Sequence, residues 1–230
     1  ICRHQGRCRR MSKGKLIVIE GLDGSGKATQ AKLLAQHLAS QGLPVREVTF
    51  PDYASDSSAL IKMYLAGQFG SKPDDVNAYA ASSFFAVDRY ASYKTSWGSF
   101  YEQGGVIIAD RYTTSNAVHQ CSKLPPEQWE SFLGWLFDFE FHLLGLPAPH
   151  FAHCPLLLAS DGRRLSKRDG DQSLENLRAK YTAPEIIGKL AYAYGLQEEP
   201  APRTPESLIK DFSWEKVPKA DICLPEGLFE

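Results

Sequence analysis

The fold of this chain is decided by ten consecutive residues near its N-terminus, Glu20-Gly21-Leu22-Asp23-Gly24-Ser25-Gly26-Lys27-Ala28-Thr29. A run of strand-forming residues, 16–19, precedes them, and a helical pattern, 30–39, follows them. A strand, a glycine-rich turn, a lysine and a helix in this order predict a phosphate-binding loop, because glycine lets the backbone point its N–H groups at a polyphosphate. The helix N-terminus adds partial positive charge, and Lys27 adds a mobile cation for the outer phosphates.

The loop departs from the usual pattern at one position. That pattern places Ser or Thr directly after the lysine, where its hydroxyl binds Mg²⁺. Here Ala28 follows Lys27, and Thr29 comes one residue later. The alternative interpretation is an ordinary glycine-rich turn, which the flanking strand, the helix and the lysine together disfavour. We therefore expect residues 21–29 to bind a nucleoside triphosphate.

Composition limits the classes of protein to consider. The chain has 230 residues, a formal net charge of −1 and 43% hydrophobic residues, enough for a core in one or two domains. Its near-neutral charge gives no general reason to expect nucleic-acid or membrane binding. The five scattered cysteines indicate free thiols and predict a cytoplasmic protein. Residues 1–12 are expected to form a disordered basic leader, with a nucleic-acid-binding arm as the alternative.

Short apolar strands alternate with helical patterns along the rest of the first 144 residues. Two further strands are expected at 45–50 and 106–109. Helices are expected at 31–41, 58–68, 74–97 and 125–144. Inward-facing positions are predicted for seven side chains of the first two helices: Leu33, Leu34, Leu38, Leu60, Ile61, Tyr64 and Leu65. Such alternation predicts an α/β fold in which helices wrap a parallel sheet and ligands bind where the strands end.

Four separated pieces lie at those strand ends and on one helix: the loop 20–30, Phe50-Pro51, Phe85-Ala86-Val87-Asp88-Arg89, and Asp110-Arg111-Tyr112 with Ser115 and Gln120. Together and in this order they resemble thymidylate kinase. The resemblance covers about residues 13–149 and implies a P-loop NTPase-type parallel sheet with helices on both faces. It also implies transfer of the γ-phosphoryl group of ATP to dTMP to give dTDP, with Mg²⁺ as the cofactor.

The resemblance gives each piece a role. Residues 21–29 would bind ATP, Asp110 would hold the metal, and Arg111 would bind the acceptor phosphate. Catalysis would rest on Lys27, Asp110 and Arg111. The dTMP site would comprise Asp23, Phe50, Pro51, Phe85, Arg89, Arg111, Ser115 and Gln120.

The residues themselves leave alternatives open at several of these positions. Phe85 and Arg89 are four residues apart on one helix face, and spacing alone favours a core phenylalanine with a surface arginine. Asp110 beside Arg111 is also compatible with a structural ion pair, and Asp23 with a turn-stabilising role. His119 stands where the family usually has tyrosine.

From about residue 150 the chain departs from that family, whose basic lid is not recognisable here. Five residues, Arg164-Leu165-Ser166-Lys167-Arg168, resemble the second ATP signature of glutamyl-tRNA synthetase and of the shorter glutamyl-queuosine tRNA(Asp) synthetase. By that resemblance Arg164 and Lys167 would bind ATP phosphates. The alternatives are a lid in another form and a solvated basic loop. The first half of the synthetase signature does not occur in the chain.

The predicted organisation is therefore a leader at 1–12, a kinase domain without its usual lid at 13–149, and a small, mostly helical synthetase-like segment at 150–230. Residues 156–158 would stand in for a fourth strand of the kinase sheet. The leading hypothesis is a thymidylate kinase that binds ATP and dTMP, forms a homodimer, and binds neither tRNA nor membranes. The alternatives are a nucleotide-binding but inactive chimera and a fragment of a glutamate-type synthetase.

Overall fold

The computed structural model describes residues 13–22, 24–165 and 173–229. It divides into two compact units, with the boundary between His150 and Phe151. We call the segments before and after this boundary unit 1 and unit 2 and describe each by itself. The expected leader, 1–12, lies outside the described residues.

Unit 1 is built on three parallel strands in the order β1-β3-β2: β1 (Lys15–Ile19), β3 (Val106–Asp110) and β2 (Val45–Thr49). The central strand, β3, is buried along its apolar run 106–109. A parallel strand covered on both faces has no polar side to alternate with, which is why its sequence is continuously hydrophobic.

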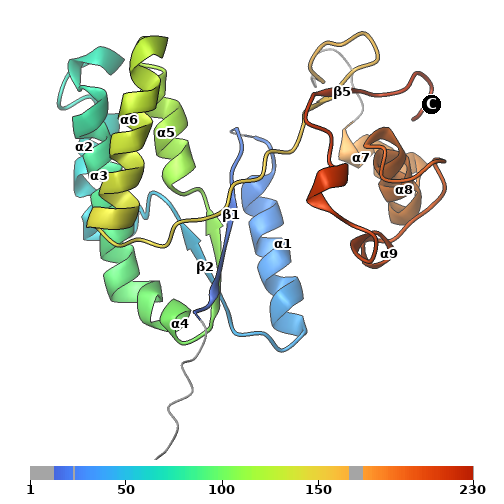
Figure 1. Ribbon diagram of the computed structural model, residues 1–230, viewed down its shortest axis with the longest axis horizontal. Helices are drawn as coiled ribbons and strands as arrows, with labels where there is room; N and C mark the ends of the chain where they lie inside the picture. The colour runs from blue at the N-terminus through green and yellow to red at the C-terminus, as the bar shows by residue number, and fades with distance from the viewer. Residues whose placement is uncertain (1–12, 23, 166–172, 230) are drawn as a thin grey trace, which may run out of the picture. The chain divides into compact units, whose positions relative to one another are not determined.

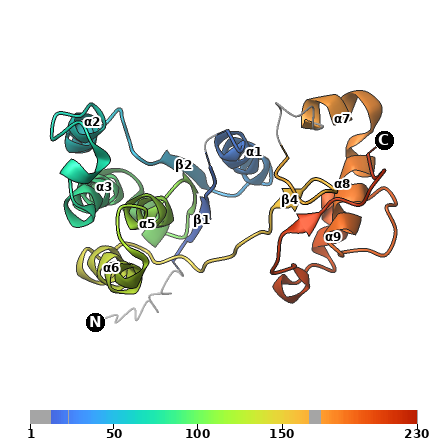
Figure 2. The same ribbon diagram turned by 90° about the horizontal axis from the view of Figure 1, so that it is seen from above.

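Helices cover both faces of this sheet, as the sequence predicted (Figure 1; Figure 2). On one face, α1 (Lys27–Ser40) packs Ala31 and Ala35 against Val106 and Ile108. On the other face, Trp97 and Tyr112 pack around Ile107. Successive strand residues thus point to opposite layers of the core, in keeping with the two-residue period of a strand.

The remaining helices of unit 1 lie on the second face. They are α2 (Ala59–Leu65), α3 (Ala78–Ser92) with a π-helical extension (Tyr93–Trp97), α4 (Gly98–Glu102), α5 (Thr113–Cys121), and α6 (Trp129–Phe137) with a π-helical extension (Asp138–Leu143). The helix expected from residue 74 begins later, because the Asn77 side chain accepts a hydrogen bond from the N–H of Ala80 and caps α3.

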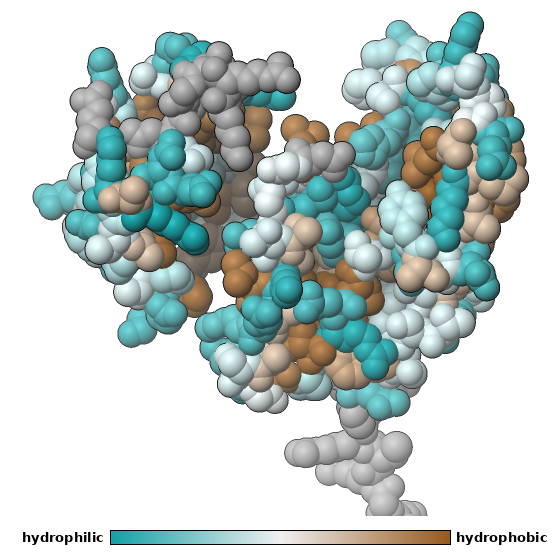
Figure 3. Space-filling model, turned by 180° about the vertical axis from the view of Figure 1, so that it is seen from behind, coloured by the Kyte–Doolittle hydropathy of each residue, from teal (hydrophilic) through white to brown (hydrophobic). Residues whose placement is uncertain are grey.

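The prediction of inward-facing leucines was wrong at three positions. Leu33 is 51% exposed, Leu60 43% and Leu65 59%. The prediction is confirmed at Ile61, which is fully buried, and in α1 the buried residues are Ala31 and Ala35. Small side chains let α1 approach the sheet closely, so its larger residues are left at the rim. Apolar side chains accordingly appear among polar ones in the surface view (Figure 3).

Unit 2 has its own two-stranded sheet, β4 (Leu157–Leu158) with β5 (Ile222–Cys223). The prediction that residues 156–158 complete the kinase sheet was therefore wrong. The N–H groups of Ile222 and Leu224 donate to the carbonyl oxygens of Leu156 (2.9 Å) and Leu158 (3.0 Å), which satisfies this segment inside its own unit.

The described residues of unit 2 also form three α-helices: α7 (Leu174–Lys180), α8 (Ala183–Ala193) and α9 (Pro205–Ile209). Its core is a cluster of four buried residues, Leu177, Ile186, Leu228 and Phe229. In the part of the chain that the structure describes, no helix is both long enough and apolar enough to cross a membrane. Three described cysteines, Cys121, Cys154 and Cys223, are free thiols.

Candidate functional site

The three strands of unit 1 end at the same edge of the sheet. Ile19, Asp110 and Thr49 stand opposite one another in the register. The chain therefore leaves this edge at Glu20, Arg111 and Phe50. Backbone hydrogen bonds hold these exits together, since the N–H of Phe50 donates to the Asp110 carbonyl (3.1 Å) and that of Arg111 to the Ile19 carbonyl (3.2 Å).

The glycine-rich loop occupies one of these exits. Gly24 and Gly26 have φ angles of 78° and 85°, values that residues with a side chain adopt only with strain. The N–H of Ser25 donates to the Leu22 carbonyl (3.2 Å), and α1 begins at Lys27. The Lys27 ammonium donates to the same carbonyl (3.4 Å). The loop residues on either side of Lys27 are exposed, so a triphosphate has access; Asp23 lies outside the described residues.

A cavity of about 1030 Å³ opens at the other two exits. Seven residues that the sequence assigned to dTMP line it: Phe50, Pro51, Phe85, Arg89, Arg111, Ser115 and Gln120. His119, which stands where the resembling family usually has tyrosine, also lines the cavity. Residues from three separate segments are thus brought to one space, but their binding of dTMP stays a prediction.

Arg111 is held in an unusual backbone conformation. Its φ angle is 69°, which costs a non-glycine residue about 1–3 kcal/mol and persists only where neighbours enforce it. The guanidinium donates to Ser115 Oγ (2.9 Å). That hydroxyl in turn donates to Glu20 Oε2 (2.5 Å). The arginine is therefore fixed at the cavity by a chain of polar contacts.

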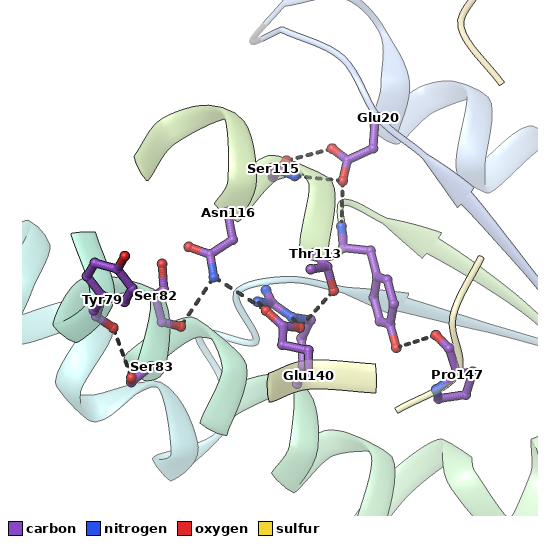
Figure 4. Close-up of polar contacts among 11 residues, drawn as sticks. Glu20, Tyr79, Ser82, Ser83, Thr113, Ser115, Asn116, Glu140 and Pro147 are labelled. Atoms are coloured by element: carbon purple, nitrogen blue, oxygen red, sulfur yellow. Dashed lines mark hydrogen bonds and ion pairs between the residues drawn. The ribbon is translucent and has the colours of Figure 1, made fainter. Parts of the chain in front are cut away.

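Glu20 ties the glycine-rich loop to this cavity. Its Oε1 accepts hydrogen bonds from the backbone N–H groups of Tyr112 (2.8 Å) and Ser115 (3.0 Å), as Figure 4 shows. These N–H groups belong to the first turn of α5, which has no side-chain cap of its own. A carboxylate at a helix N-terminus supplies the missing acceptor and complements the helix dipole.

Arg89 is buried, not on the surface as its spacing alone suggested. Only 2% of it is exposed, and its guanidinium binds Glu140 side-on through Nε (2.7 Å) and Nη2. It still lines the cavity. Phe85 beside it is half-buried and meets Tyr64 edge-on, with the ring centroids 6.3 Å apart.

Asp110 has the chemistry of a metal ligand. Its Oδ1 is buried and has no hydrogen-bond partner among the described residues. A carboxylate oxygen buried in this way is costly unless a cation or a donor satisfies it. No group of three or more His, Cys, Asp or Glu side chains able to hold a metal occurs in the described ranges. Mg²⁺ needs only one or two carboxylates when phosphates and water complete its shell, so Asp110 fits this ion.

Burial also affects Tyr112, which packs between Phe50 and Phe141. Desolvation raises the pKa of its phenol far above the usual range. The hydroxyl donates to the Pro147 carbonyl (3.2 Å). Tyr112 is therefore a neutral wall of the cavity and not an acid or a base.

Sequence reasoning missed several polar residues around the cavity. Glu140 binds Arg89, and Glu20 binds Ser115, the hydrogen-bond partner of Arg111. Asp88 is 1% exposed and accepts from the Asp52 N–H (2.9 Å) and Ser57 Oγ (2.5 Å), which fixes the chain after Pro51. Asn116 is 4% exposed and lines the cavity. The available signal was an acidic residue inside an apolar run, as at Glu140 between two phenylalanines.

Unit 2 contains the synthetase-like loop, of which only part is described. Arg164 and Leu165 are exposed, and a β-bridge joins Arg164 to Leu158. Leu165 lines a second cavity, of about 580 Å³, whose other walls are mostly apolar. Ser166, Lys167 and Arg168 lie outside the described residues. ATP binding by this loop therefore stays a prediction.

Two of the comparisons with known proteins span only part of the chain. Over 86 residues the chain is 44% identical to a glutamyl-Q tRNA(Asp) synthetase of Symbiobacterium thermophilum, and this match spans 37% of the chain but only 27% of that protein. A solved structure of thymidylate kinase from Candida albicans is 29% identical, covers 55% of this chain and 56% of its own, and has a TM-score of 0.42.

Comparisons with thymidylate kinase sequences cover up to 70% of this chain. The family model for thymidylate kinase matches residues 19–128. A thymidylate kinase of Mycobacterium tuberculosis is 32% identical over 166 residues, which span 70% of this chain and 76% of that enzyme. Because this match extends over three quarters of a known family member, the chain belongs to the thymidylate kinase family.

Proposed function

We propose that this chain transfers the γ-phosphoryl group of ATP to dTMP, giving ADP and dTDP. The observation that supports it best is the single cavity at the ends of β2 and β3, which gathers seven residues of the predicted acceptor site. Glu20 adds further support, because it links this cavity directly to the glycine-rich loop that would hold the donor. Donor and acceptor phosphates would then lie within reach of each other.

In the reaction an oxygen of the dTMP phosphate attacks the γ-phosphorus of ATP. The bond from this phosphorus to the bridging oxygen breaks, and ADP leaves. Such transfers need positioning and charge neutralisation more than covalent participation by the protein. Lys27 and the N–H groups of the loop would neutralise the β- and γ-phosphates. Arg111, already fixed by Ser115, would hold the acceptor phosphate through two parallel N–H donors.

Asp110 would hold Mg²⁺, directly or through water. When bound, the ion supplies positive charge for the donor phosphates. Ala28 offers no ligand atom, so the metal contact that a hydroxyl usually makes at this position is lost. The buried, unpartnered Oδ1 of Asp110 is the group in unit 1 best suited to compensate.

The base would lie between Phe85 and the polar wall formed by Arg89 and Gln120. An aromatic face packs on a pyrimidine ring, and a planar guanidinium donates to its carbonyl edge. Gln120 is 2% exposed, and its Oε1 has no partner among the described residues. The predicted homodimer and cytoplasmic location stay predictions.

The test is dTDP formation by the purified whole chain with ATP, Mg²⁺ and dTMP. We expect turnover in the wild type and a loss of roughly 100-fold or more in Lys27→Ala, because a cation on the transferring phosphate is removed. The matched control is Lys32→Ala, an exposed lysine on the same helix, which should keep full activity.

One result would contradict the proposal, namely wild-type dTDP formation no higher than in a protein-free control. If ATP and dTMP nonetheless raise the melting temperature of the same protein, the chain is the nucleotide-binding but inactive chimera.

A further inference from the structure

Glu140 is a fully buried carboxylate that lies behind the wall of the cavity. It has no exposed surface and is not among the residues that line the cavity. It comes from the π-helical segment Asp138–Leu143. An ionised carboxylate in this position is costly unless donors surround it, so its partners determine what it does.

The partners of Glu140 are all hydrogen-bond donors, and they come from two helices. Arg89 of α3 donates through Nε (2.7 Å) and Nη2. From α5, Thr113 donates through Oγ1 (2.7 Å) and Asn116 through Nδ2 (3.4 Å), as Figure 4 shows. One carboxylate thus joins the two helices that provide the polar wall of the cavity.

This network fixes the orientation of the Asn116 amide. Its Nδ2 faces Glu140 and also donates to the Ser82 carbonyl (3.2 Å). Both partners are acceptors, so the amide nitrogen must point toward them and the amide oxygen away. That oxygen is buried and has no partner among the described residues. Asn116 lines the cavity, so this oxygen is the atom of its amide that is left to accept from a ligand there.

The same network fixes the orientation of Arg89. Glu140 binds one side of the guanidinium, which leaves further N–H donors of the fork on a residue that lines the cavity. Arg89 and Asn116 both bond to Glu140 Oε1, so the donor and the acceptor are neighbours. A ligand edge that complements this pair has a carbonyl oxygen next to a ring N–H.

We propose that Glu140 is a positioning residue that sets the cavity's preference for a thymine-type edge over a cytosine-type edge. The inference rests on the proposed function, in which the cavity takes a pyrimidine nucleoside monophosphate. Thymine and uracil present a carbonyl beside a ring N–H. Cytosine presents an amino group beside an unprotonated ring nitrogen, which places donor against donor and acceptor against acceptor. Sites built from buried polar groups reject such a mismatch strongly.

The test is Glu140→Gln in the whole chain, with dTMP and dCMP affinities measured by calorimetry and kcat and KM measured with dTMP. The amide keeps the size of the carboxylate but presents one donor where Arg89 and Asn116 also donate. We expect dTMP affinity to fall roughly 10-fold, the dTMP-to-dCMP affinity ratio to fall with it, and kcat to change much less than KM. A purely structural role would not change the ratio.

The matched control is Asp138→Asn, the same chemical change two residues earlier. Asp138 is exposed and pairs with His142, so both affinities should stay at their wild-type values. Glu140→Asp keeps the buried charge and should give an intermediate ratio, and it serves if Glu140→Gln does not fold. A wild-type ratio in the folded Glu140→Gln protein, or in Glu140→Asp where only that variant folds, overturns the inference.

Calorimetry also separates this inference from the kinase activity. A wild-type chain that binds dTMP without turnover removes the proposed kinase function, while the affinity ratio still decides the role of Glu140. A wild-type chain that binds no dTMP overturns both.

Discussion

The two units differ in what they bury. Every polar or charged side chain that is buried among the described residues belongs to unit 1, and the set includes Asp88, Arg89 and Glu140. The buried side chains of unit 2 are apolar, such as Leu177 and Phe229. Burying polar groups costs free energy unless they are paired, and three of these buried residues, Arg89, Asn116 and Gln120, line the cavity, which is typical of a functional site.

The largest expected effect is at Arg111, where a substitution tests whether unit 1 alone carries the proposed nucleotide site. Replacing Arg111 by Gln would remove the proposed fork for the acceptor phosphate, and two charge-assisted hydrogen bonds are worth about 1.5–3 kcal/mol each. We expect kcat/KM for dTMP to fall roughly 1,000-fold. The same change in unit 2, Arg178→Gln on the exposed side of α7, should leave steady-state kinetics unchanged. An equal loss in both variants would break the distinction between the units.

A substitution in the core of unit 2 tests whether ligand binding by unit 1 is independent of the stability of unit 2. Leu177 is 6% exposed in the cluster with Ile186 and Phe229. Leu177→Ala should destabilise unit 2 by about 2–4 kcal/mol in denaturant unfolding, because it removes buried methyl groups and leaves a cavity. Because unit 1 has a core of its own, dTMP affinity at 25 °C should be unchanged. A parallel loss of affinity would show that the two units are one cooperative structure.

Within unit 1, Glu20 tests whether polar contacts behind the cavity support ligand binding. Glu20→Ala removes the acceptor for the N–H groups of Tyr112 and Ser115 and for the Ser115 hydroxyl. We expect the free energy of unfolding to fall by about 1–3 kcal/mol. We also expect weaker dTMP binding, because Arg111 donates a hydrogen bond to the same Ser115. Glu47→Ala, an exposed acidic residue on β2, is the control. Unchanged dTMP affinity in Glu20→Ala would contradict the linking role of this residue.

The smallest expected effect concerns the pH dependence of unit 2. Hydrogen bonds from the Thr182 hydroxyl and N–H lower the pKa of Glu185 below its ordinary value of 4.5. The folded pKa is the lower one, so the cap stabilises α8 fully above pH 4.5 and is lost as the pH falls through the folded pKa. Thr182→Val should flatten this part of the pH profile of melting temperature. A profile identical to that of the wild type would contradict the capping contact.

The elements that sequence predicted best were those with a local pattern. The loop, the three strands and their shared edge follow from glycine positions, apolar runs and parallel register. The residues of the proposed acceptor site were assigned through family resemblance, because neither Phe85 nor Arg89 indicates a ligand by spacing alone. Local patterns also misled, since α1 buries alanines and leaves Leu33 at the surface.

Long-range partners could not be predicted from the sequence. Glu140 is 51 residues from Arg89, and Glu20 is 95 residues from Ser115. No local period connects such pairs, because they meet only after the helices have packed on the sheet. The role of Leu156 and Leu158 depended in the same way on a distant partner, Ile222 to Leu224 in unit 2.

The central claim is that the nucleotide acceptor binds in the cavity of unit 1. The most direct test is irradiation of the whole chain with 4-thio-dTMP, followed by peptide mapping of the crosslink. The account predicts labelling confined to residues 49–123, the span that contains the cavity lining, and its suppression by excess dTMP. Labelling of peptides from unit 2, or labelling that dTMP does not suppress, would contradict it.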